Sequence, residues 1–157
     1  LSPAKQSIMY QLAMNAEARN DAGSALNYYK MAFEAEPKNT TARTLYAAAL
    51  IRAGNEAAAD EVIAPILESG NAAEPRITQA YLNRQRYDKI VEIWSAFVKV
   101  NPQNEQGHFT LAAAYYAKGD KENAIATLER AKVAKPEIAA QADQLIGEIR
   151  SGTAKIQ

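Results

Sequence analysis

The residue types that most often carry out chemistry are sparse in this sequence, and their spacing does not assemble a catalytic site. His108 is the only histidine, and the chain contains no cysteine. A catalytic histidine needs an orienting acid and a nucleophile, and no motif in the sequence supplies them. We therefore interpret His108 as a structural or surface residue. The absence of cysteine also excludes disulfide bonds and thiolate metal sites.

Two short polar clusters also have the form of functional motifs. Glu56, Asp60 and Glu61 could suggest a cation site, but acidic residues at the start of a helix commonly face solvent and complement the helix dipole. Asn39-Thr40-Thr41 matches the triplet that accepts N-linked glycans, yet Asn and Thr in this place also serve as helix caps. We expect neither a metal ion nor a cofactor.

Charge and hydropathy exclude further classes of function. Lysine plus arginine and aspartate plus glutamate both number 18, so the formal net charge is zero. Such a chain has no general attraction to nucleic acid or to an anionic membrane. The longest apolar run, Leu45 to Ile51, is far shorter than the roughly 20 residues of a membrane span. The first residues lack a signal-peptide pattern, and because residue 1 is leucine we interpret the chain as an excised domain or a processed product.

The elements that would position any functional group follow from an internal repeat. Pro102 and Pro136 lie 34 residues apart, and the segments that end there align, with Tyr81 opposite Tyr115. Pro37 ends an earlier copy of the same pattern. A fixed period of this length indicates a repeat protein, in which each repeat is one supersecondary element. The four repeats begin near Gln6, Thr40, Asn71 and Glu105.

Each repeat is predicted to form two helices joined by a sharp turn. The residues with the spacing of one helical face in the fourth repeat are His108, Leu111, Ala112 and Tyr115. Gly119 should end this helix, and Asp120 should cap the next one. The packing face of that second helix is formed by Ala124, Leu128 and Ala131, and Pro136 ends it. The alanines would let two crossing helices approach closely.

Both ends of the chain carry helix signals. Ser2-Pro3 fits a cap followed by proline in the first turn. After Pro136, a helix over residues 137–150 would end the stack, with a packing face of Ile138, Ala142, Leu145, Ile146 and Ile149. We therefore predict an all-α single domain, residues 1–157, with nine helices and no strand. Its repeats span approximately residues 6–39, 40–70, 71–104 and 105–138.

The repeats resemble the tetratricopeptide repeat, which has small residues where helices cross, large residues beside them, and a proline at the end. The first repeat matches with Leu12, Ala13, Ala25, Tyr29, Ala32 and Pro37. The fourth matches with Leu111, Ala112, Tyr115, Gly119, Ala124, Leu128, Ala131 and Pro136. The resemblance implies a right-handed superhelical stack. It also implies a scaffold that binds other proteins, rather than an enzyme.

Two repeats depart from the family pattern. Pro65 lies inside the predicted second helix of the second repeat, where we expect a kink or an early end. The third repeat has Thr78, Ile90 and Phe97 where small residues are usual, and Pro75 early in its first helix. Its helices should be packed further apart, or its first helix should be shorter.

The resemblance also implies where a partner would bind, because the first helix of each repeat lines the concave groove of such stacks. The groove positions carried onto this chain are Tyr10, Met14, Glu17, Thr44, Ile51, Arg52, Gln79, Leu82, Asn83, Gln106, Phe109 and Tyr116. Their aromatic and apolar members suggest an extended or helical partner segment with apolar anchors. The alternative is that Tyr10, Phe109 and Tyr116 only pack on neighbouring helices. For Trp94 and Phe97 we favour core packing over a ligand box.

One subclass of this family is argued against by the residues present. Chaperone adaptors hold a C-terminal carboxylate with lysine, asparagine and arginine at set groove positions. The corresponding positions here are Tyr10, Met14, Leu45, Ala72 and Arg76, of which only the arginine fits. A carboxylate clamp is therefore not expected.

A second resemblance is narrower. Residues 76–131, together with the ending at 144–152, are similar to the C-terminal repeats of bacterial O-antigen ligase-type membrane proteins. This similarity implies a soluble domain tethered to the bacterial inner membrane through a preceding part that polymerises or transfers glycans, with glycan-assembly proteins as partners. A free soluble adaptor and a structural self-assembly module remain as alternatives.

Overall fold

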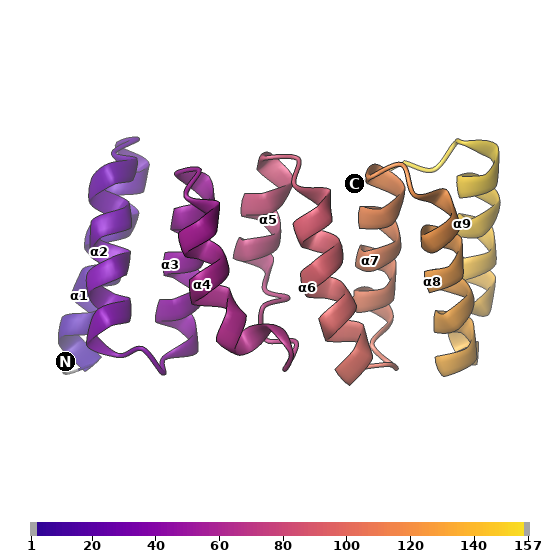
Figure 1. The fold of residues 1–157 in the computed structure, drawn as a ribbon, viewed down its shortest axis with the longest axis horizontal. Coiled ribbons are helices and arrows are strands. Elements are labelled where there is room, and N and C mark those ends of the chain that lie inside the picture. The colour runs from indigo at the N-terminus through magenta and orange to yellow at the C-terminus, as the bar shows by residue number, and fades with distance from the viewer. Residues whose placement is uncertain (1–2, 156–157) are drawn as a thin grey trace. The chain divides into compact units, whose positions relative to one another are not determined.

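The computed structural model describes residues 3–155, and every regular element in that range is helical. The elements are α1 Pro3–Ala18, α2 Ala22–Ala35, α3 Thr40–Arg52, α4 Glu56–Leu67, α5 Pro75–Asn83, α6 Tyr87–Val100, α7 Glu105–Ala117, α8 Lys121–Ala134, the 3₁₀ helix η1 Pro136–Ile138 and α9 Ala139–Ser151 (Figure 1). Over this range the prediction of an all-α chain with nine α-helices is confirmed. Ser2, predicted to cap the first helix, lies outside the described residues.

The chain divides into two compact units, which we call the first and second packing units. The first contains the residues up to Pro65 together with Glu74–Arg84, and therefore holds α1, α2, α3, α5 and most of α4. The second contains Ile66–Ala73 and the residues from Gln85 onward, and therefore holds α6 to α9.

The two helices of each repeat are joined by a turn with one residue in the left-handed conformation. These residues and their φ angles are Asn20 (57°), Gly54 (81°), Gln85 (56°) and Gly119 (88°). A left-handed residue ends a helix because it turns the chain out of the hydrogen-bond ladder. Asp120 follows, and its side chain accepts a hydrogen bond from the Asn123 N–H at 3.1 Å, so the predicted stop and cap are both confirmed.

Small residues form the helix crossings of the first packing unit. Ala13, Ala16 and Ala25 are buried around the large side chain of Tyr29. This places α1, α2 and α3 side by side (Figure 1). A small side chain at a crossing lets the helix backbones approach, and a large neighbour then fills the space beside it.

The core of the second packing unit follows the predicted pattern. Ala112, Ala124 and Leu128 are fully buried and pack with one face of α9, formed by Ala142, Ile146 and Ile149, with Leu145 partly buried beside them. After α9 the C-terminal segment, residues 153–155, turns back toward α7 (Figure 1). Ala154 of this segment packs against the same core.

The departures from the repeat pattern appear as shortened helices. α5 has only nine residues, whereas α3 and α7 each have 13, which confirms the shorter first helix predicted for the third repeat. Its start is fixed by Pro75 and by the Glu74 side chain, which accepts a hydrogen bond from the Arg76 N–H at 2.7 Å. α4 continues through Pro65 and ends two residues later, at Leu67.

Candidate functional site

Two of the twelve predicted groove residues are buried, and for them the prediction is wrong. Thr44 is only 3% exposed and Ile51 is 0% exposed. The hydroxyl group of Thr44 donates to the Thr41 carbonyl at 3.1 Å, within its own helix. The reason is that α3 packs against α2 on one side and α5 on the other, so most of its surface is covered. Neither side chain is available to a partner.

A polar network joins α1, α2 and α3 of the first packing unit. The Glu17 carboxylate forms an ion pair with Arg52 and accepts a hydrogen bond from the Tyr29 hydroxyl group at 3.2 Å. Burial, and then the nearby Glu17, raise the pKa of Tyr29. Glu17 and Arg52 line a pocket of about 360 Å³ together with Asn20 and several alanines. Because these charges already neutralise each other, the pocket offers little to a charged ligand.

The other predicted groove residues of the first packing unit are exposed or half-buried. Met14 is 63% exposed, whereas the Tyr10 hydroxyl group is buried without a hydrogen-bond partner, and burial, followed by Glu36, raises its pKa. Gln79 donates to Asn83 at 2.7 Å along α5, beside the exposed Leu82. Arg76, the one residue that fits a carboxylate clamp, forms an ion pair with Glu74 at 2.8 Å.

The second packing unit brings three predicted groove residues together in one pocket, which we call the α7–α9 pocket. It has a volume of about 460 Å³ and is lined by Gln106, Phe109, Thr110, Ala113, Tyr116, Gln141, Leu145, Ile149, Ala154 and Lys155. Phe109 and Tyr116 also pack against the core, so the pocket wall and the core share these two rings. The Gln106 side chain donates to the Thr110 hydroxyl group at 3.2 Å. The arrangement offers an apolar wall with amide and hydroxyl groups beside it.

Sequence reasoning missed the contribution of the C-terminal segment to this pocket. Ala154 and Lys155 line it, but the residues after Gly152 carry no motif that would place them there. The turn at Gly152, which has a φ angle of 76°, ends α9 and redirects the chain. Gly152 is a helix-stop signal in the sequence, but the direction that the chain takes after it depends on packing.

The residues considered for chemistry take structural roles. His108 is 7% exposed, and its Nε2 lies 2.7 Å from the carbonyl oxygen of Pro102. Since a carbonyl can only accept, the ring proton lies on Nε2. The Asn39 side chain caps α3 by accepting from the Ala42 N–H at 3.0 Å. Trp94 and Phe97 are half-buried and pack edge to face, with ring centroids 5.1 Å apart.

The acidic residues near the start of α4 also have protein partners. Glu56 accepts a hydrogen bond from Arg84 at 3.3 Å, and Asp60 accepts one from the Tyr81 hydroxyl group at 3.3 Å. Within residues 3–155 no three histidine, aspartate or glutamate side chains gather in a way that could hold a metal ion.

Paired helices with alanine crossings, a common turn and a closing helix define a helical repeat protein. Two models of the tetratricopeptide repeat match the sequence, one over residues 16–82 and the other over residues 78–138. The chain therefore belongs to the tetratricopeptide-repeat family.

Solved structures show the same fold. A double mutant of MamA from strain RS-1 has 19% sequence identity and a TM-score of 0.57, with 94% of this chain and 84% of that chain covered. MamA from Desulfovibrio magneticus RS-1 has 19% identity and a TM-score of 0.53, covering 95% and 86%. A thermophilic TPR protein of Thermus thermophilus has 17% identity and a TM-score of 0.53, covering 95% and 83%. At these identities the similarity concerns the fold alone.

The search of curated protein sequences gives no match, so the comparisons leave the resemblance to O-antigen ligase-type proteins without support. Among residues 3–155, no helix combines the length and the hydropathy that a membrane span requires.

Proposed function

We propose that this domain is a non-catalytic scaffold that binds a segment of another protein along the surface of its first helices. Membership of the tetratricopeptide-repeat family supports the general role. The observation that carries the proposal is the α7–α9 pocket, where Gln106, Phe109 and Tyr116 lie together. An apolar wall flanked by a few polar groups is the usual form of a site that holds one anchoring side chain of a peptide.

The chemistry of the α7–α9 pocket favours an apolar anchor on an extended segment. Residues 153–155 of the chain are not helical, and Ala154 packs beside Phe109, Tyr116 and Leu145. A partner segment with a small or medium apolar side chain would make the same contacts. Within the first packing unit, exposed predicted residues such as Met14 and Leu82 offer apolar side chains of their own to a partner.

A peptide library displayed against the purified domain tests this proposal. We expect selected peptides to share spaced apolar residues, and Ala113→Glu to abolish their binding because it places a charge in the pocket wall. Ala140→Glu makes the same change on an exposed position of α9 and serves as the matched control. Both variants should keep the helical signal of the native domain. Peptides that bind Ala113→Glu as well as they bind the native domain would contradict the assignment of the pocket.

Self-assembly is the second candidate function, and one observation favours it. Leu12 of α1 is 38% exposed, whereas Leu111, at the same repeat position in α7, is 2% exposed. Ile8, one helical turn before Leu12, is also exposed. A second copy could cover these side chains. Sedimentation over a range of concentrations would then show association that Leu12→Gln removes and Ala113→Glu leaves unchanged.

A narrower form of the proposal places the domain in a bacterial membrane protein that assembles glycans. It rests on the sequence resemblance of residues 76–131 and 144–152 alone. The reading frame upstream of Leu1 tests it, because several apolar runs of about 18 residues or more would indicate a membrane part. A polar upstream region would instead favour a free adaptor.

A further inference from the structure

A second pocket of the second packing unit shares no lining residue with the α7–α9 pocket. It has a volume of about 380 Å³ and lies where α6, α7 and α8 meet. Its polar side chains are Ser95, Lys99, His108, Tyr115, Thr127 and Arg130, and none of its lining residues is acidic. We call it the α6–α8 pocket.

The charge around the α6–α8 pocket is positive and is not neutralised. Lys99 on α6 and Arg130 on α8 form no ion pair within residues 3–155. The nearby acids are engaged elsewhere, since Glu129 pairs with Lys132 at 3.0 Å and Glu105 pairs with Lys135 at 2.7 Å. Two unneutralised positive charges on one pocket attract an anion and repel a cation.

The floor of the α6–α8 pocket contains a buried polar group that the protein leaves without a partner. Nε2 of His108 donates to the Pro102 carbonyl, while Nδ1 is buried and has no hydrogen-bond partner. Because the ring proton lies on Nε2, Nδ1 carries only a lone pair and can accept a hydrogen bond from a ligand hydroxyl group, but it contributes nothing to holding a phosphate oxygen. The Thr127 hydroxyl group donates to the Asn123 carbonyl at 2.7 Å and accepts from Arg130 at 3.2 Å, so it tethers the guanidinium to the pocket wall and has no proton left for a ligand.

At the position equivalent to the α6–α8 pocket beside α3, a larger side chain fills the space. Arg43 stands at the repeat position of His108, and its guanidinium lies 5.2 Å from the ring centroid of Phe33 and donates to the Val62 carbonyl at 2.7 Å. Val62 stands at the position of Thr127, and Glu34 at that of Lys99. The α6–α8 pocket therefore results from three local exchanges, which introduce a smaller side chain, a hydroxyl group and a positive charge.

We propose that the α6–α8 pocket binds a phosphate group, with Lys99 and Arg130 holding its charge and the hydroxyl groups of Ser95 and Tyr115 beside it. Charge-assisted hydrogen bonds from arginine and lysine are the strongest that a phosphate receives. The volume falls within the range of small-molecule pockets, roughly 300 to 1,000 Å³, and leaves room for an organic group that carries the phosphate.

Calorimetric titration of the whole chain at constant ionic strength tests this site. The two ligands are inorganic phosphate and glycerol phosphate, a simple monoester. We expect saturable binding at one site per chain. Tighter binding of the monoester assigns the site to an organic phosphate, and equal binding assigns it to the free ion. The absence of saturable binding by either ligand overturns the proposal.

Three substitutions locate the bound phosphate. Lys99→Glu introduces the residue that stands at this position in the first repeat, Glu34, and Arg130→Ala removes the other charge. Each should weaken binding about 10-fold or more because a charge-assisted hydrogen bond is lost. Lys155→Ala removes one charge from the α7–α9 pocket of the same packing unit and should leave phosphate binding unchanged. Arg130→Ala and Lys155→Ala each remove one positive charge, so equal losses in these two variants would mean attraction by overall charge and would overturn the site.

Discussion

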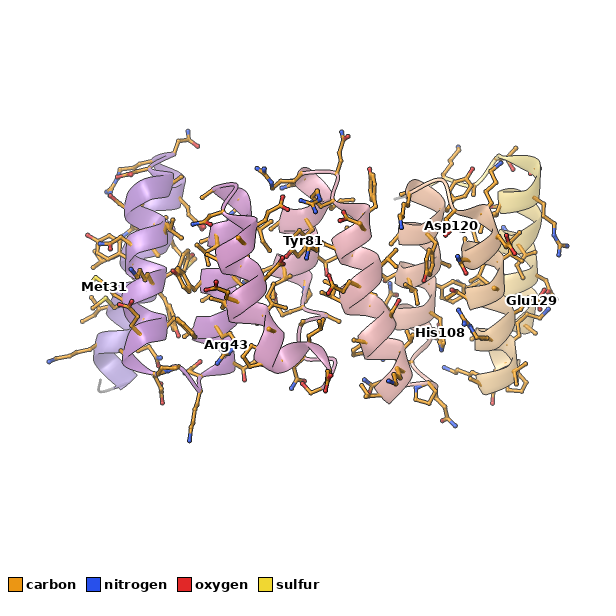
Figure 2. The ribbon with its side chains drawn as sticks, in the orientation of Figure 1. Met31, Arg43, Tyr81, His108, Asp120 and Glu129 are labelled. Carbon is orange, nitrogen blue, oxygen red and sulfur yellow. The ribbon has the colours of Figure 1, made fainter. Side chains whose placement is uncertain are left out.

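The first helices of the second and fourth repeats, α3 and α7, begin in the same way but carry different side chains four residues after the cap. Asn39 and Asn104 cap them in the same way, accepting from the Ala42 N–H at 3.0 Å and from the Gly107 N–H at 2.8 Å. Four residues after each cap, a side chain reaches back to a proline carbonyl at the end of the preceding repeat. Figure 2 labels these two side chains, Arg43 on α3 and His108 on α7.

The shared contact is close in both repeats, but the two side chains leave different amounts of space. Arg43 donates to the Pro37 carbonyl at 2.8 Å, and His108 lies 2.7 Å from that of Pro102. Arg43 also donates to the Val62 carbonyl of α4 at 2.7 Å. Histidine is shorter and makes no such second bond. The repeat pattern thus determines the helix, its cap and the contact with the proline carbonyl. The size of one side chain determines whether the space beside that contact is filled.

The largest effect in this comparison is expected for Arg43→Ala. The change removes two hydrogen bonds from a charged donor and the contact with the Phe33 ring. We expect the free energy of unfolding to fall by roughly 2–3 kcal/mol, which urea denaturation measures. Arg43→Lys keeps the charge but cannot reach two carbonyls at once. Its free energy of unfolding should therefore lie between that of the native chain and that of Arg43→Ala. If Arg43→Ala unfolds at the same urea concentration as the native chain, the contacts of Arg43 contribute nothing to stability.

A smaller effect is expected at the residue before these side chains. Ala42 is buried in α3, and Gly107 takes its place in α7. A Cβ atom on Gly107 would lie 2.8 Å from two ring atoms of Phe97. We expect Gly107→Ala to destabilise the domain by about 1 kcal/mol, because the strain of overpacking exceeds the gain in helix propensity.

A double-mutant cycle separates this clash from other causes. Phe97 occupies the repeat position of Ala32, so Phe97→Ala together with Gly107→Ala reproduces the equivalent pair, Ala32 of the first repeat and Ala42 of the second. Once Phe97 has been replaced by alanine, Gly107→Ala should leave the free energy of unfolding unchanged or increase it. Additive losses in the double mutant would show that Gly107 is needed for another reason.

The residues compared above show why the sequence predicts the backbone well but predicts the packing of side chains only in part. Helix limits depend on local signals such as Gly119, Asp120 and Pro136, which act within a few residues. Phe97 was judged against the family pattern alone, and the prediction missed that Gly107 makes room for its ring. The complementary residues are ten positions apart in different helices, so only their contact in space reveals the relation.

The groove residues illustrate the same limit. Family positions placed Thr44 and Ile51 on the groove, but α3 is covered from two sides and both are buried. They also placed Gln106, Phe109 and Tyr116 on α7, where the three line one pocket. Periodicity indicates which side chains share a helical face. It does not indicate how much of that face the neighbouring helices cover.

The smallest expected effect concerns the acidic caps of the second helices and depends on pH. Hydrogen bonds from the side chain and the N–H of Asn123 lower the pKa of Asp120 below its usual value of 3.8. The stabilising contribution of this carboxylate is complete above the unfolded-state pKa and is lost as pH falls through the lower folded-state pKa. Asparagine caps a helix without titrating, so Asp120→Asn should lose less stability than the native chain between about pH 6 and pH 3.

Asp21 has the same role at the start of α2, where the side chain and the N–H of Ser24 lower its pKa. Asp21→Asn should therefore reduce the acid sensitivity by a similar amount, as measured by urea denaturation at both pH values. A reduction in Asp120→Asn but not in Asp21→Asn would break the equivalence of the two caps. Stability in acid would then depend on the surroundings of each packing unit, rather than on the turn that the repeats share.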